Sequence, residues 1–143
     1  MTQEDKELLL KDLCARLSCK VKLGFENSDL ILIPEEFNVY TMQLSTNQIY
    51  PKVDRAVIKH IYDIWNYRPY LRPMSSMTEE ECIALSRLRP HETDAWKYIK
   101  TPIPLYIANI KQFDFFHRHH LDWRGLILMG LALEAPEGMY KTE

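Results

Sequence analysis

The stretch TQEDKELLLKDLCARLSCKVKLGF, residues 2–25, changes its hydrophobic period once, and this change decides the fold class. Over residues 3–17, apolar side chains recur three and four positions apart, as on one face of an amphipathic helix. From Cys19 they alternate with other residues, as on a half-buried strand that ends near Phe25. A helix followed at once by a strand predicts an α+β chain.

Sequence signals at two positions predict how helices begin. Thr2 is followed three residues later by Asp5, and Thr78 by Glu81, which is the spacing of a capping box. The second helix has to stop before Pro90, because proline cannot continue a helix. Within the first helix, Asp12 and Arg16 lie four residues apart and form an opposite-charge pair.

The remaining elements are predicted from short apolar runs and from proline positions. We expect strands at residues 30–33 and 39–44, with an edge strand at 49–53 that contains a proline. Helical spacing after Asp54 predicts a helix over residues 57–66.

The second half of the chain is predicted to be mainly helical. Residues 67–77 cannot continue a helix, because Pro69 and Pro73 force the preceding Arg68 and Arg72 toward extended geometry. A helix is expected over residues 108–119. Asp122 is expected to cap a shorter helix over residues 123–129, which Gly130 would close in a left-handed conformation.

Together these signals predict one α+β domain over residues 1–143. Its parts are an N-terminal helix, a small antiparallel sheet of three or four strands, and a mainly helical C-terminal half. A chain of 143 residues buries a core without disulfides or a structural metal.

Composition excludes several functional classes. The net charge of −2 gives no positive field for duplex nucleic acid, and four scattered glycines make no phosphate-binding loop. The three cysteines lack a metal-binding spacing, so we expect reduced, mostly buried thiols and no cofactor. No apolar run is long enough for a membrane span, and the polar residues after Met1 predict a cytoplasmic protein.

A histidine-rich segment is the densest group of reactive side chains. His117 and His120 share a helix face and Asp122 follows, which would suit a zinc site and a metal-dependent hydrolase. The same face carries Phe113 and Phe116, so packing and capping are the favoured roles. We therefore expect no metal and no catalytic residue here.

The extended segment offers a candidate ligand site at Arg68, Tyr70 and Arg72. The alternation is interpreted as placing the tyrosines on one side and both arginines on the other, where two guanidiniums could hold a phosphate. The alternative is that the arginines pair with the acidic turn at residues 79–81. That alternative is favoured, because three glutamates at a helix start repel an added anion.

Three blocks carry a family resemblance. PYLRPMSSMTEEE at 69–81, HHLDWRGLILMGLALEAPEGMY at 119–140 and the helix TQEDKELLLKDLCARL at 2–17 resemble small proteins encoded by phages and prophages of gut Bacteroidales. The resemblance implies an accessory protein made in the cytosol of a bacterial host, with no particular chemistry. Its implied partner is a host protein or a small host-derived ligand.

One departure from that family concerns surface chemistry. Where a polar pair is expected after Ile127, this chain has Leu128 and Met129. The two side chains extend the apolar arc of the predicted last helix, so we predict that they lie at a homodimer or partner interface. The alternative is that residues 91–110 fold over them.

Three functions follow from these observations. The favoured one is a non-enzymatic binding protein that interferes with a host protein or a host defence signal. The second is a nucleotide-binding sponge that uses Arg68, Arg72 and the tyrosines. The third is a metal-dependent hydrolase that uses His117, His120 and Asp122.

Overall fold

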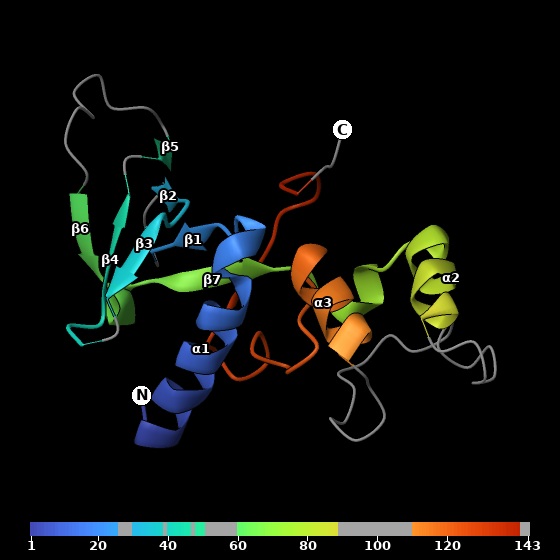
Figure 1. Cartoon of the computed structure of the whole chain (residues 1–143), viewed down its shortest axis with the longest axis horizontal. Coiled ribbons are helices and arrows are strands. Elements are labelled where there is room, and N and C mark those ends of the chain that lie inside the picture. Colours follow the sequence, from blue (N-terminus) through green and yellow to red (C-terminus); the bar gives the residue numbers. More distant parts are fainter. Residues whose placement is uncertain (26–29, 39, 47, 51–59, 89–109, 141–143) are drawn as a thin grey trace. The chain divides into compact units, whose positions relative to one another are not determined.

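The computed structural model describes residues 1–25, 30–38, 40–46, 48–50, 60–88 and 110–140 (Figure 1). It confirms the predicted α+β class, with an N-terminal helix, antiparallel strands and later helices. The chain divides into two compact units: unit 1 comprises residues 1–70 and 131–133, and unit 2 comprises residues 71–130 and 134–143. Two compact units can still fold as one domain, so the single-domain expectation stays a prediction.

The first helix begins as predicted. Helix α1 spans Gln3–Arg16, and the Thr2 hydroxyl accepts a hydrogen bond from the Asp5 amide at 3.1 Å. The Asp5 carboxylate accepts one from the Thr2 amide in return, which completes the capping box. A short 3₁₀ turn, η1 (Leu17–Cys19), follows, and Lys20 then turns the chain in a left-handed conformation with φ of 56°.

The strands form two sheets (Figure 1), and β1 with β2 and β7, β2 with β5, and β4 with β3 and β6 pair antiparallel. The five-stranded sheet has the order β5-β2-β1-β7-β8, and its strands are β1 (Leu23–Gly24), β2 (Ile31–Leu32), β5 (Ile49–Tyr50), β7 (Arg68–Leu71) and β8 (Leu133–Glu134). The three-stranded sheet has the order β3-β4-β6, and its strands are β3 (Glu36–Asn38), β4 (Gln43–Thr46) and β6 (His60–Asp63). As predicted, the strand that begins at Ile49 lies at a sheet edge.

The prediction of a helix over residues 57–66 is wrong for residues 60–66, the part of that range that the structure describes. Residues 60–63 form strand β6, and Ile64–Asn66 form the 3₁₀ turn η2. Strand β6 pairs along its whole length with β4. Isoleucine-rich runs suit a strand at least as well as a helix, and this pairing decides between them. Residues 51–59 lie outside the described residues.

Unit 1 is held by an apolar core and one buried ion pair. Its fully or nearly fully buried side chains come from α1, from the strands and from the segments between them: Leu9, Leu13, Val21, Leu23, Leu32, Leu44 and Ile64. Asp12 and Arg16, the predicted pair on α1, are both completely buried and meet at 2.8 Å. The predicted pair is therefore part of the interior of unit 1.

A glycine in β1 allows a close approach by an aromatic ring. Gly24 is paired with Arg68 of β7, and a β-carbon added at Gly24 would collide with the ring of Tyr70. Tyr70 is anchored by its own amide, which donates to the Lys22 carbonyl at 2.8 Å. The ring therefore covers the glycine, which explains why no side chain is present there.

Replacing Gly24 by alanine is expected to lower the free energy of unfolding by about 1–3 kcal/mol, the usual cost of overpacking. Urea denaturation measures this cost. The same substitution in a Tyr70→Leu background should cost much less, because the clashing ring is gone. An equal cost in both backgrounds would contradict the contact.

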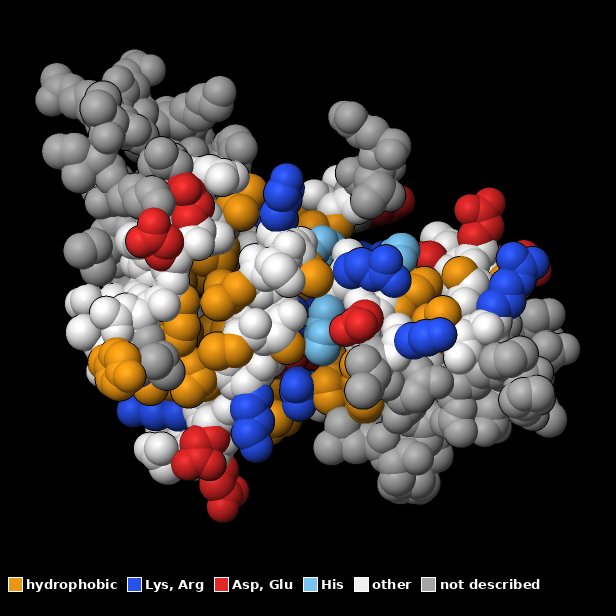
Figure 2. Space-filling model, viewed as in Figure 1, with side chains coloured by type: hydrophobic (Ala, Val, Ile, Leu, Met, Phe, Trp, Pro, Cys, Tyr) orange, Lys and Arg blue, Asp and Glu red, His pale blue; other side chains and the backbone are white. Residues whose placement is uncertain are grey.

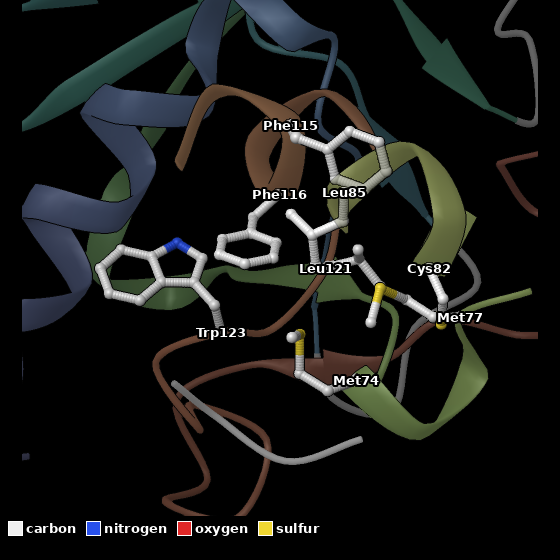
Figure 3. Packing of buried hydrophobic residues seen from close by; sticks show 8 residues of the cluster. All are labelled: Met74, Met77, Cys82, Leu85, Phe115, Phe116, Leu121 and Trp123. Carbon is white, nitrogen blue, oxygen red and sulfur yellow. The ribbon is translucent and has the colours of Figure 1, made fainter. Parts of the chain in front are cut away.

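The described part of unit 2 contains two nine-residue helices and the turns around them. They are α2 (Glu79–Arg87) and α3 (Ile110–Arg118), and the 3₁₀ turn η3 (Met74–Ser76) precedes the first. Their buried side chains form one cluster (Figure 3): Met74, Met77, Cys82, Leu85, Phe115, Phe116, Leu121 and Trp123. Cys82 is the one buried thiol, because Cys14 is exposed and Cys19 half-buried, so the expectation of mostly buried cysteines is wrong.

The predicted helix over residues 123–129 does not form. The segment consists of turns, and the Asp122 carboxylate accepts hydrogen bonds from the amides of Leu126 at 2.7 Å and Ile127 at 2.9 Å. A helix N-cap would bond the second or third amide of its helix, so Asp122 stabilises a wider loop instead. Gly130 does adopt the predicted left-handed conformation, with φ of 74°.

Candidate functional site

A groove of about 910 Å³ lies within unit 2. Three separate stretches of the chain line it: the segment from Arg72 to α2, the C-terminal end of α3, and residues 134–140. Its size lies within the range of typical ligand sites, about 300–1,000 Å³. We take it as the candidate functional site.

Backbone hydrogen bonds fix Arg72 at one wall of the groove. The Arg72 amide donates to the His120 carbonyl at 2.7 Å, and the Asp122 amide donates to the Arg72 carbonyl at 2.8 Å. These bonds make a parallel bridge between Arg72 and Leu121. They join residues far apart in the sequence, which the sequence alone could not reveal.

The Glu81 carboxylate is the centre of the polar network in the groove. Both of its oxygens accept from the Arg72 guanidinium, at 2.7 and 2.8 Å, in the bidentate geometry of a strong ion pair. The same carboxylate accepts from the Thr78 amide, and the Thr78 hydroxyl accepts from the Glu81 amide, so the predicted capping box is confirmed. The His119 Nδ1 atom lies 3.0 Å from Glu81 Oε2.

The environment of Glu81 favours its charged form. Burial by itself would raise the pKa of this carboxyl, but the hydrogen bonds from Arg72, His119 and the Thr78 amide outweigh it and hold the pKa well below its ordinary range. Arg72 also donates to the carbonyls of Ser76 at 3.1 Å and His119 at 3.3 Å. The network therefore ties η3, α2 and the end of α3 together.

Helix α3 ends in a Schellman motif that places a histidine where glycine is usual. His120 has φ of 58°, its amide donates to the His117 carbonyl at 3.2 Å, and the Leu121 amide donates to the Phe116 carbonyl at 2.9 Å. The His120 ring stacks on Tyr140, with 3.7 Å between centroids, and both rings line the groove. Strained residues of this kind concentrate at functional sites.

Glycine at position 120 is expected to give a more stable protein than alanine, by about 1 kcal/mol, because only alanine retains the left-handed strain. Thermal melts of His120→Gly and His120→Ala test this difference. Position 84, on α2, provides the control: Ala84→Gly should lose about 1 kcal/mol. Glycine less stable than alanine at position 120 would contradict the assignment.

The structure places the side chains of the predicted ligand site, Arg68, Tyr70 and Arg72, on other strand faces than the sequence analysis expects. Arg68, Tyr70 and Arg72 alternate with the buried Pro69 and Leu71, so the arginines share a strand face with Tyr70 and the predicted opposite faces are wrong. In a β-strand, side chains two positions apart lie on the same face, so positions 68, 70 and 72 share one face.

The two arginines have different partners. The Arg68 guanidinium donates to the carbonyls of Trp65 and Tyr67, both at 3.0 Å, within unit 1. Arg72 pairs with Glu81 in unit 2, so the favoured alternative, in which both arginines pair with the acidic turn, is confirmed for Arg72 and is wrong for Arg68. Ligand binding by Arg68, Tyr70 and Arg72 stays a prediction.

The zinc-ligand candidates have other partners. Trp123 Nε1 donates to His117 Nε2 at 3.0 Å, which makes that nitrogen an acceptor, and Asp122 binds backbone amides. Within the ranges that the structure describes, no group of three His, Cys, Asp or Glu side chains could hold a metal ion.

Leu128 and Met129 are exposed, by 92% and 48% of their surface. Side chains at an interface have to be exposed in the single chain, and both are. The homodimer or partner interface at Leu128 and Met129 stays a prediction. The alternative was that residues 91–110 fold over these two side chains. Residues 91–109 lie outside the described residues, so this alternative stays a prediction.

Comparisons with protein-family models, with curated proteins and with solved structures found no match. None of the helices in the described ranges has the length and apolar character needed to cross a membrane. On the face drawn in Figure 2, acidic and basic side chains are interspersed and form no field of one sign.

Several residues of the groove have no role in the sequence analysis, among them His119, Tyr140, Glu134 and Glu137. His119 bonds a carboxylate on another helix, and Tyr140 stacks on a ring 20 positions earlier in the chain. The one local signal was the capping box, which fixes the Glu81 carboxylate at the start of α2.

Proposed function

We propose that this chain is a non-enzymatic binding protein and that its partner occupies the unit 2 groove. In keeping with the family resemblance, the proposed setting is a phage or prophage accessory protein that acts on a host protein. One observation carries the proposal: the polar side chains at the centre of the groove are bonded to one another, which makes a rigid wall for a partner.

The hydroxyl groups of the groove support binding over catalysis. A serine or threonine nucleophile needs a base within hydrogen-bond reach. The Ser76 hydroxyl donates to the Pro73 carbonyl at 2.7 Å, and the Thr78 hydroxyl caps α2. His119 is directed at Glu81, whose charge Arg72 already neutralises. These contacts are those of a structural network.

Site-specific photo-crosslinking in host cells tests this proposal. A photoreactive phenylalanine analogue replaces Ala84, which is exposed and lines the groove, and in a matched control it replaces Lys11 on α1. We expect a discrete adduct with one host protein from position 84 and none from position 11. No adduct, the same adducts from both positions, or an adduct of two copies of this chain would contradict the proposal.

A further inference from the structure

Apart from its internal ion pair, the groove is lined by more acidic than basic side chains. Arg72 and Glu81 neutralise each other. Three exposed carboxylates remain among the lining residues, Glu80 on α2, Glu134 on β8 and Glu137 in the following turn, against one exposed guanidinium, Arg118. Glu80 comes from α2, whereas Glu134 and Glu137 come from the stretch at residues 134–140, so the groove brings carboxylates of two separate segments together.

The groove offers little to an anion. The Arg72 guanidinium already makes four hydrogen bonds, two to the Glu81 carboxylate and two to backbone carbonyls. A phosphate or a carboxylate entering the groove would meet three negative charges and only Arg118 as an exposed arginine.

Aromatic side chains line the same groove. The half-buried Tyr140 stacks on the buried His120 with 3.7 Å between centroids, and the half-buried His119 stacks on the buried Phe115 at 4.2 Å, so Tyr140 and His119 are the rings that a ligand can reach. Lysine and arginine place long aliphatic stems on such surfaces while their charged heads reach carboxylates. Guanidinium and ammonium groups are also attracted to aromatic faces.

We infer that the groove binds a basic segment of the partner protein, one whose lysine or arginine side chains reach Glu80, Glu134 and Glu137. The inference rests on the proposed function and specifies its partner. It is carried by charge complementarity, by the aromatic lining and by a volume of about 910 Å³, which exceeds the needs of one side chain.

Fluorescence anisotropy with the full chain tests this inference. The probe is a labelled ten-residue peptide in which lysine and arginine alternate with glycine and serine, and a glutamate version serves as the anionic probe. We expect the basic peptide alone to bind. Its affinity should fall when salt rises from about 50 to about 300 mM, because near 0.1 M salt exposed charges are screened over about 10 Å.

Charge reversal identifies the groove as the binding site. The triple variant Glu80→Lys, Glu134→Lys, Glu137→Lys should bind the basic peptide at least tenfold more weakly. The control Glu4→Lys, Glu7→Lys, Glu36→Lys changes net charge equally at exposed positions that do not line the groove, and should bind within twofold of the wild type. Circular dichroism verifies that both variants fold.

The inference would be overturned if the wild type did not bind the basic peptide, or if the two triple variants lost affinity equally. Preference for the glutamate peptide would do the same and would favour an anionic ligand. If the crosslink from position 84 still forms in these cases, the groove binds a partner of another chemistry. If neither assay gives a signal, the proposed function fails as well.

Discussion

Asp12→Ala is expected to lower the free energy of unfolding by about 3–5 kcal/mol, because it leaves the fully buried Arg16 charge without its carboxylate. The carboxylate and the guanidinium both have zero exposure, so water cannot replace the lost partner. Equilibrium urea denaturation at neutral pH measures the effect.

The double variant Asp12→Leu, Arg16→Met separates lost charge pairing from lost packing. It removes both charges and keeps apolar volume, so it should recover most of the stability lost by Asp12→Ala. A cost below about 1 kcal/mol for Asp12→Ala would contradict the buried pair. An equal cost for single and double variants would show that the charge is not the cause.

Glu81→Gln is expected to cost about 2–3 kcal/mol at neutral pH, because Arg72 and His119 lose their anionic partner. The value lies below that of a fully buried pair, since the Arg72 and Glu81 side chains keep 21% and 14% exposure. Glu79→Gln, two residues earlier in the chain and exposed, is the control and should change stability little.

The loss should depend on pH in a defined direction. The folded pKa of Glu81 is depressed, so its contribution is fully present above the unfolded pKa of about 4.3 and is lost as pH falls further toward the folded value. The stability gap between wild type and Glu81→Gln should therefore be constant from pH 7 to about 5 and should narrow below about 4. Melts that show a constant gap down to pH 2 would contradict the network.

Local signals in the sequence predicted the local features of this fold. Both capping boxes depend on contacts over three residues, and both formed, at Thr2 and at Thr78. Helix α3, Ile110–Arg118, likewise lies within the predicted range of residues 108–119. Such features need no knowledge of distant parts of the chain.

Features that depend on distant partners were predicted poorly. Strand β6 pairs with β4, about 17 residues away, and this pairing overrides helical spacing. At Asp122, a carboxylate that could cap a helix instead bonds the amides of Leu126 and Ile127. Competition between side-chain and helical hydrogen bonds is not visible in a pattern of residue types.

Part of the candidate site, the ion pair of Arg72 with the acidic turn, could be predicted from the sequence. The sequence favours pairing of Arg72 with the acidic turn, because three glutamates at a helix start repel an added anion, and Arg72 does pair with Glu81. The groove itself required knowing that residues 134–140 and the end of α3 lie beside that turn. No periodicity within either segment carries that information.

Chemical-shift mapping of the full chain with the basic ten-residue peptide tests the central claim most directly, because it locates the binding site residue by residue. In ¹H–¹⁵N spectra, we predict that the amides of Ala84, His119, Glu134 and Glu137 shift progressively with peptide, while those of Glu4 and Lys11 do not. Shifts confined to Leu128 and Met129, or no shifts at saturating peptide, would contradict the assignment of the groove as the binding site.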